Sequence, residues 1–371
     1  MNKGLKNLLL LFLSIIIAFF VAEGLSRLFF DPIDFLKPKT VPDEVLRYKI
    51  EPNSGAHDSW GFRNKSVPQS VDIVAIGDSH TYGISAMASN SWPSILQNLS
   101  GKQVYNISLG GYGPAEYLYL MEDKALSLNP KIIIVGLYLG NDLKNAITNV
   151  YSVPIWKDLR NPEFQFNSED VLEIDKYRFS VSNFLAGHSV IYRIISSSFI
   201  GDYLRQRRRV NMGEEIIMFS NKESGITTGF TPDKRLEGLD LNDSEVAEGL
   251  RLTLELFNRM NEISRENGVK FLVLLIPTKE SVFSNFIMNN NELANSAKID
   301  LLINNERLVS EIVKKYFNQH SIDYIDLLDP LRNASGNEQL YPRNFGGHAN
   351  KNGYRIFAET IYQHISTNSY Y

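Results

Sequence analysis

The sequence Gly77-Asp78-Ser79-His80-Thr81-Tyr82-Gly83 joins two different patterns. The residues before it, Val71–Ile76, form a short and mostly apolar run that predicts a β-strand, whereas Trp92–Leu99 has the pattern of a helix. Ser79 therefore lies in the turn after the carboxyl end of a strand, where open α/β sheets bind their ligands. The two glycines permit a tight turn and close approach of a substrate. The stretch also fits an ordinary turn in which Asp78 and Ser79 only cap backbone groups.

Composition narrows the class of protein. The chain has 371 residues, 43% hydrophobic and 22% charged, which are values of a globular protein with one or two domains. A net charge of −4 argues against a general nucleic-acid binder, so we expect no nucleic-acid partner. The absence of cysteine excludes disulfides, thiolate metal sites and cysteine nucleophiles.

The rest of the chain alternates strand and helix patterns. Four further strands are predicted after the first, at Gln103–Ile107, Lys131–Val135, Phe271–Ile276 and Ile322–Asp326. Five strands separated by helices predict an α/β fold, in which helices cover both faces of a parallel sheet. We place this body at residues 70–371.

One long interval, about residues 143–241, breaks the alternation and shows no clear strand pattern. Residues 179–204 have a helical pattern, which is followed by Arg205, Arg207, Arg208 and Arg209. An insertion of this length at the edge of a sheet is a candidate lid or substrate platform. The basic run fits either a solvated helix end or a contact with anionic lipid or an acidic polymer.

The N-terminus predicts a membrane anchor. Lys3 and Lys6 precede an unbroken apolar run, Leu8–Ala22, and apolar residues resume up to Phe30. A cleavable signal peptide fits less well, because cleavage after Ala22 would put the bulky Phe20 where a small residue is needed. We therefore expect residues 1–30 to be an uncleaved single-pass anchor in the cytoplasmic membrane, with the body on the extracytoplasmic side.

Residues 31–69 contain five prolines and many polar residues, so this segment is predicted to be a linker between the anchor and the body. Within it, Trp60-Gly61-Phe62-Arg63 is expected to dock on the body.

Three other stretches complete a possible site around Ser79. Leu109–Gly113 follows the second strand and offers backbone N–H groups, and Gly140-Asn141-Asp142 follows the third and offers a side-chain amide. Both kinds of donor stabilise a developing oxyanion. Near the C-terminus, the loop Gly346–Gly353 contains His348, which is placed to reach over the sheet edge as a general base.

In this order, the four stretches resemble the blocks of the SGNH/GDSL hydrolase superfamily: a Gly-Asp-Ser motif, a glycine after the second strand, a Gly-x-Asn-Asp motif and a C-terminal histidine. The resemblance implies a three-layer, flavodoxin-like fold with a five-stranded parallel sheet. It also implies Ser79 as nucleophile, His348 as base, and an oxyanion hole made by the Ser79 N–H with Gly111 and Asn141. No metal or other cofactor is implied. The anchor and long insertion resemble membrane-anchored bacterial members, some of which act on cell-envelope polysaccharide.

One position departs from the family pattern. The family usually has an aspartate three residues before the histidine, and this chain has Phe345 there. We expect a weaker group to orient His348, either the Asn344 side chain or a backbone carbonyl. Asp326 and Asp329 are the first alternatives if a carboxylate arrives from elsewhere.

The sequence therefore predicts a serine esterase that removes O-acyl groups, most readily O-acetyl groups, from a cell-envelope glycan. The first alternative is a glycan O-acetyltransferase that forms the same acyl-enzyme and passes the acyl group to a sugar hydroxyl. The second alternative is a non-catalytic glycan-binding or assembly protein with a degenerate triad.

Overall fold

The structure is a computed structural model of the whole chain. It describes residues 3–166, 180–196, 217–221, 224–288, 297–368 and residue 370. The predicted basic run at residues 205–209 lies outside the described residues.

The centre of the molecule is a five-stranded parallel sheet with the strand order β4-β3-β5-β8-β9. The strands are β3 (Ile73–Gly77), β4 (Val104–Ser108), β5 (Ile132–Tyr138), β8 (Lys270–Ile276) and β9 (Asp323–Asp326). All four pairings are parallel, for example Val135 with Val273 between β5 and β8. The five predicted strands and the flavodoxin-like strand order are therefore confirmed.

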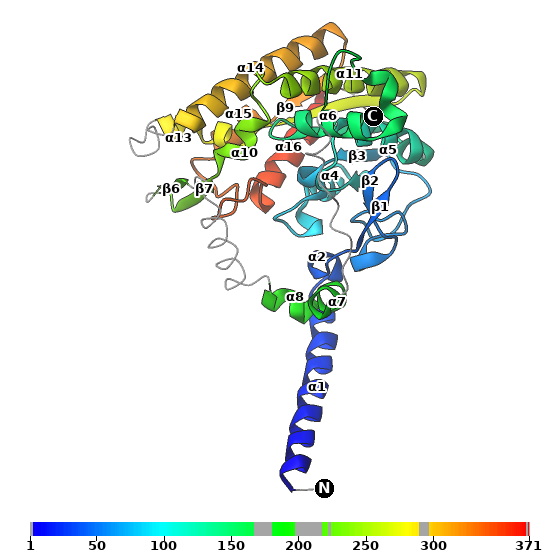
Figure 1. Cartoon of the computed structure of the whole chain (residues 1–371), viewed down its shortest axis with the longest axis vertical. Helices are drawn as coiled ribbons and strands as arrows, with labels where there is room; N and C mark the ends of the chain where they lie inside the picture. Colours follow the sequence, from blue (N-terminus) through cyan, green and yellow to red (C-terminus); the bar gives the residue numbers. More distant parts are fainter. Residues whose placement is uncertain are drawn as a thin grey trace.

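Helices cover both faces of the sheet, which makes three layers (Figure 1). Residues that alternate along β3 belong to opposite layers: Val74 and Ile76 pack in one apolar core, Ile73 and Ala75 in the other. The first core is closed by α5 (Pro114–Leu120), α6 (Asp142–Ser152) and α11 (Ser244–Glu266), and the second by α4 (Trp92–Ser100) and α16 (Lys351–Thr367). Because both faces are covered, the β3 and β5 residues are buried throughout.

The strand order reverses direction at β3, between β4 and β5. All five strands are parallel, so their carboxyl ends share one edge of the sheet. The turns after β3, β4, β5 and β8 therefore meet at this edge, and crevices at such a reversal are where ligands bind in open α/β folds.

The segment predicted as a linker is packed on the body over much of its length. It forms a hairpin of β1 (Thr40–Asp43) and β2 (Arg47–Ile50), and Leu46 and Phe62 are buried in the first core. The expected docking of residues 60–63 is confirmed, because Arg63 donates hydrogen bonds to the carbonyls of Tyr82 and Gly83.

The insertion contains strands that the sequence pattern did not indicate. β6 (Ile217–Asn221) and β7 (Ile226–Phe230) form an antiparallel hairpin, so the expectation of no strand between residues 143 and 241 was wrong. The hydrophobic pattern that would mark these strands is weak, because β6 is largely solvated and Gly229 interrupts β7. The hairpin gains its partners from a distant loop: the Gly229 N–H donates to the Asn344 carbonyl, and Gln339 donates to the Thr227 carbonyl.

The predicted helical region of the insertion is present as α7 (Val181–His188) and α8 (Val190–Ser196). These helices lie beside α2 (Pro32–Phe35) and the end of α1 (Lys3–Phe29), at the base of the body (Figure 1). Helix α1 is long and apolar enough to cross a membrane, and the 18-residue window with a mean hydropathy of 2.7 is not buried by the rest of the chain.

Candidate active site

Ser79 and His348 are in contact although they are 269 positions apart in the chain. Ser79 is the first residue of the short helix α3 (Ser79–Tyr82), directly after β3, and His348 lies in the loop before α16. The His348 Nε2 atom is 2.8 Å from the Ser79 Oγ atom. This is the contact that a base needs to take the hydroxyl proton of a nucleophile.

Asp78 holds the serine turn in shape. Its side chain caps α3 by accepting a hydrogen bond from the His80 N–H at 2.8 Å, as the capping interpretation of this stretch predicts. Its other oxygen lies 3.1 Å from the Ser79 Oγ. Burial raises the pKa of Asp78 to about 6. The serine hydroxyl thus has two acceptors, and His348 is the nearer.

The glycine loop after β4 lies against the serine. A Cβ atom on Gly110 would stand 3.4 Å from the Ser79 Cβ, which shows how closely the loop backbone approaches. The hydroxyl of Tyr48 donates to the Gly110 carbonyl at 2.7 Å, and Arg47 donates to the Gly111 carbonyl at 3.0 Å. Gly111 has φ +85°, and a Cβ there would lie 2.3 Å from the Tyr48 hydroxyl, so this position requires glycine.

Tyr48 thereby orients the N–H group of Gly111. The Gly110 carbonyl and the Gly111 N–H belong to one planar peptide unit and point in opposite directions. Holding the carbonyl on Tyr48 fixes the direction of the N–H, which is the predicted oxyanion donor. Burial raises the pKa of Tyr48 to about 12, so its hydroxyl stays protonated and remains a donor.

Asn141 is the residue before α6, at the carboxyl end of β5. Its side-chain oxygen is buried without a hydrogen-bond partner. Its amide nitrogen also has no partner among the described residues, and Asn141 lines a large cleft together with Gly111. An amide N–H₂ without a partner in such a cleft is free to donate to a substrate oxygen.

No carboxylate contacts His348 in the described part of the chain. Phe345 is buried, and its ring packs beside Gly229 of β7. The Asn344 side chain, our candidate for orienting His348, accepts a hydrogen bond from the Gly346 N–H instead. The two alternatives are engaged elsewhere as well: Asp326 pairs with Lys314 and Asp329 with Arg332.

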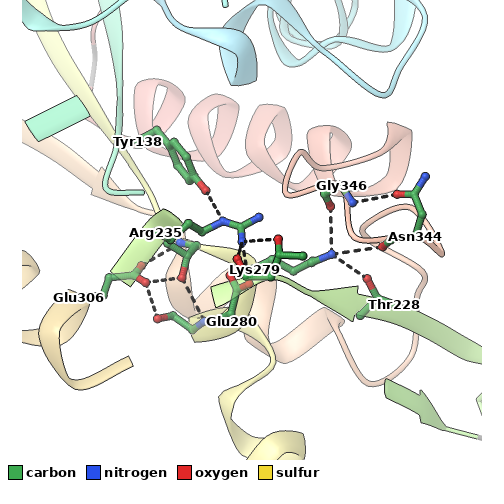
Figure 2. A network of polar contacts seen from close by, with 11 residues as sticks. Tyr138, Thr228, Arg235, Lys279, Glu280, Glu306, Asn344 and Gly346 are labelled. Carbon is green, nitrogen blue, oxygen red and sulfur yellow. Dashed lines mark hydrogen bonds and ion pairs between the residues drawn. The ribbon is translucent and has the colours of Figure 1, made fainter. Parts of the chain in front are cut away.

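Two basic side chains, Lys279 and Arg235, occupy the region behind the histidine loop (Figure 2). Lys279, fully buried at the start of α12 (Lys279–Val282), donates to the carbonyls of Asn344 and Gly346 and to the Thr228 hydroxyl. Arg235 of α10 (Pro232–Glu237) donates to the Tyr138 hydroxyl and pairs with Glu280 at 2.9 Å. One Arg235 nitrogen packs so closely on Gly347 that a Cβ there would lie 2.3 Å from it. These contacts fix the position of the loop that carries His348.

The electrostatics of the histidine are therefore the reverse of those in a Ser-His-Asp triad. Burial, Arg235 and Lys279 together lower the pKa of His348 to about 4. At neutral pH the imidazole is uncharged and able to accept a proton. The imidazolium that forms during catalysis is stabilised by Asp in a triad. Here it faces the Arg235 guanidinium and Lys279, whose own pKa is lowered by burial to about 7.

His80 is buried and packs against His348. Its ring centroid is 4.1 Å from that of Tyr138 and 4.8 Å from that of His348. Both of its ring nitrogens are buried without a hydrogen-bond partner, and burial lowers its pKa well below the usual value. His80 is thus a neutral side chain that confines His348 on one side.

Fold and site together define an α/β protein with a serine–histidine pair of the hydrolase type at the carboxyl edge of its sheet. No family model and no curated protein matches the chain. Among solved structures, similar folds occur in a GDSL-like lipase from Bacteroides thetaiotaomicron (11% identity, TM-score 0.37) and in a lipase/acylhydrolase from Enterococcus faecalis (13%, 0.36). A third is a catalytic mutant of an acetylxylan esterase from Geobacillus stearothermophilus (9%, 0.39).

The matches to these three structures cover 80–81% of this chain and 93–95% of theirs. With identities of 9–13% and TM-scores of 0.36–0.39, the likeness carries no information on the roles of individual residues. Those roles rest on the geometry of the site.

Sequence reasoning missed four residues around the site: Arg47, Tyr48, Arg235 and Lys279. The first two lie in the segment interpreted as a linker and the third in the insertion, so no motif marked them. Lys279 carried a usable signal, because it follows the carboxyl end of a predicted strand within Ile276-Pro277-Thr278-Lys279-Glu280.

Proposed function

We propose that this protein is a serine esterase that removes O-acyl groups, most readily O-acetyl groups, from a glycan. The observation that carries the proposal is the 2.8 Å contact between the Ser79 Oγ and the His348 Nε2 at the topological reversal of the sheet. An acyl ester is the substrate class because the site combines a nucleophile and a base with candidate oxyanion donors.

The reaction proceeds in two steps. The Ser79 oxygen attacks the ester carbonyl carbon as His348 takes the hydroxyl proton, and the N–H groups of Ser79, Gly111 and Asn141 hold the oxyanion. The C–O bond of the ester breaks, and the leaving sugar oxygen takes the proton from His348 and departs as a hydroxyl group. Water then attacks the acyl-enzyme with His348 again as base, which releases the carboxylic acid and restores Ser79.

The proposed location is the cytoplasmic membrane, with α1 as anchor and the body on the extracytoplasmic side. Its support is the apolar surface of α1 together with Lys3 and Lys6 at its N-terminal side. A cell-envelope glycan is the substrate that this location provides.

A fluorophosphonate probe tests the proposal, because it labels only an activated serine. We expect the wild type to be labelled and Ser79→Ala to lose both labelling and esterase activity while its thermal unfolding is unchanged. Loss of a triad serine has cost on the order of 10⁶ in kcat. Ser91→Ala is the matched control, since Ser91 is also buried and lies outside the site. Labelling that persists in Ser79→Ala would refute the assignment, and a wild type that is never labelled would favour the non-catalytic alternative.

Acyl transfer to a sugar is the second candidate, favoured by the size of the cleft. Its volume of about 1780 Å³ exceeds the roughly 300–1,000 Å³ of a typical small-molecule site, so it has room for a donor and an acceptor. Mass spectrometry after incubation with an acetyl ester and an oligosaccharide separates the two: free acetate indicates hydrolysis and an acetylated oligosaccharide indicates transfer.

A further inference from the structure

Apolar side chains surround the place where α1 meets the body. Leu28 and Phe29, at the end of α1, are each 78% exposed, and Val181 on α7 and Ile195 on α8 are 69% and 67% exposed. Large apolar side chains seldom gather on a surface without a partner. We call this group the juxtamembrane collar; it consists of Leu28, Phe29, Phe30, Val181 and Ile195.

The two parts of the collar are joined by polar contacts. Glu23 of α1 accepts hydrogen bonds from the Ser189 hydroxyl at 2.9 Å and from the N–H groups of Val190 and Ile191 at 3.0 and 3.1 Å. Arg27 pairs with Glu23 at 2.8 Å and donates to the His188 carbonyl at 2.6 Å. Helices α7 and α8 are therefore fastened to the anchor itself (Figure 1).

The length of the anchor sets the depth of the collar. At 1.5 Å per residue, the unbroken run Leu8–Ala22 spans only about 22 Å, whereas a bilayer core is about 30 Å thick. The apolar span reaches a bilayer thickness only when it continues past Glu23 to Phe30, about 35 Å from Leu8. Glu23 and Arg27, which neutralise each other, then lie within about 11 Å of the end of this span, and α7 and α8 are held at the same level.

One cleft is shared by residues at the end of α1 and of α7 and by the catalytic loops. It is about 1780 Å³ in volume, and its lining includes Arg27, Gly187 and His188, which neighbour the collar in sequence, as well as Gly111 and Asn141. The polar residues Lys39, Glu51 and Asn145 line it too. An amphiphile with its tail in the bilayer and a polar head in this cleft would reach the oxyanion donors without leaving the membrane.

We propose that the collar is immersed in the leaflet beside the body and that the cleft admits the head group of a membrane-embedded amphiphile, namely a lipid-linked saccharide that carries the scissile ester. The chemistry of the ester rests on the proposed function, whereas the immersion of the collar does not depend on it. The continuity of the collar with α1 identifies the bilayer as its occupant.

Fluorescence quenching tests the immersion. The chain has no cysteine, so Val181→Cys, Ile195→Cys and Leu308→Cys can each carry a single NBD label. Leu308 is the matched control: it is 48% exposed and lies on α14 (Ala297–Gln319), at the end of the body remote from α1 (Figure 1). In phosphatidylcholine vesicles with doxyl-labelled lipid, we expect quenching at positions 181 and 195 and none at 308. Absence of quenching at both collar positions would overturn the proposal.

Two acetylated glycosides test the route to the site. The wild type should hydrolyse both water-soluble methyl tetra-O-acetylglucoside and hexadecyl tetra-O-acetylglucoside held in vesicles. The double variant Val181→Glu/Ile195→Glu should lose at least about fivefold in rate on the hexadecyl compound alone, since charge opposes insertion of the collar. Leu308→Glu should change neither rate.

The outcomes separate the two proposals. Equal loss on both glycosides, or no loss on either, would overturn entry from the membrane. If the wild type hydrolyses neither compound, the proposed function fails, and the quenching experiment still decides whether the collar is immersed.

Discussion

At the scale of single residues, His348 is the unusual member of the site. A triad aspartate holds the histidine tautomer and stabilises the imidazolium, and replacing it by asparagine has cost about 10⁴ in kcat. Here Arg235 and Lys279 lie behind the histidine loop, and Lys279 holds that loop through the carbonyls of Asn344 and Gly346. The loop is positioned, but the charge formed on His348 is not compensated. We therefore expect slow hydrolysis of simple esters.

The pH–rate profile of hydrolysis should report this environment. A histidine is competent as a base only above its pKa, and the pKa of His348 is lowered to about 4. As far as His348 governs it, kcat/KM should therefore stay level from about pH 8 down to about pH 5 and fall only toward pH 4. Asp78, with a pKa of about 6, also contacts Ser79. An inflection near the ordinary histidine value of about 6.5 that persists in Asp78→Asn would contradict the assignment.

Lys279→Met provides the internal comparison for this profile. The substitution removes one of the two cations that lower the pKa of His348, so the acid limb should move to higher pH. Lys314→Met is the control, since Lys314 pairs with Asp326 away from the site. An acid limb that stays in place in Lys279→Met would show that Lys279 does not act on His348.

Asn141 has a separate kinetic signature. An oxyanion donor acts in the transition state, and removing one has cost about 10²–10³ in kcat. Asn141→Ala should show such a loss with little change in KM in steady-state kinetics on an acetyl ester. Thr148→Ala, which lines the same cleft from α6, should keep its kcat. An effect on KM alone would make Asn141 a substrate-binding residue.

At the scale of elements, the β1–β2 hairpin supports the glycine loop after β4. The Tyr48 hydroxyl fixes the Gly110–Gly111 peptide, and Arg47 pairs with the buried Glu116 at 3.0 Å. Burial raises the pKa of Glu116 to about 7 although Arg47 lies beside it, so burial outweighs the ion pair there. The hairpin thus serves the site without supplying a reacting group.

Tyr48→Phe tests this support. It removes one hydrogen bond, with a net value of about 0.5–1.5 kcal/mol, and lets the Gly111 N–H turn away from the oxyanion. We expect kcat to fall by roughly twofold to tenfold with an unchanged KM, measured in parallel with thermal unfolding. The control is Tyr119→Phe on α5, whose hydroxyl has no hydrogen bond among the described residues. Equal rates in both variants would mean that Tyr48 does not orient the loop.

At the scale of the whole molecule, the boundary of the folded body falls before residue 69. Asp58 is buried and accepts hydrogen bonds from the Tyr105 hydroxyl and from the N–H groups of Trp60 and Phe62. Removing residues 1–69 would leave the Tyr105 hydroxyl unpaired and uncover apolar core, whereas removing residues 1–30 would spare these contacts.

Two truncations test that boundary by thermal unfolding. The chain without residues 1–30 should be soluble and unfold cooperatively. Without residues 1–69, the melting temperature should drop by at least about 10 °C. The deletion removes several kcal/mol of unfolding free energy, and each kcal/mol shifts the melting temperature by about 2–4 °C in a large domain. Equal melting temperatures would restore the interpretation of residues 31–69 as a plain linker.

The sequence by itself determined the α/β fold, the five strands, the positions of Ser79 and Asn141 after strand ends, and the placement of His348 in the loop before the last helix. It could do so because apolar runs and glycine turns are local signals, and because parallel strands necessarily bring their carboxyl ends to one edge.

Only the tertiary structure decided what surrounds the histidine and what holds the glycine loop. Arg235 and Lys279 come from the insertion and from the turn after β8, and Tyr48 comes from a proline-rich segment without a motif. Their roles arise from burial and from contacts between residues far apart in the chain, such as Tyr48 and Gly110, which are 62 positions apart. Burial lowers the pKa of His348, and the contact with Tyr48 fixes the direction of the Gly111 N–H. Neither property is encoded in a local sequence pattern.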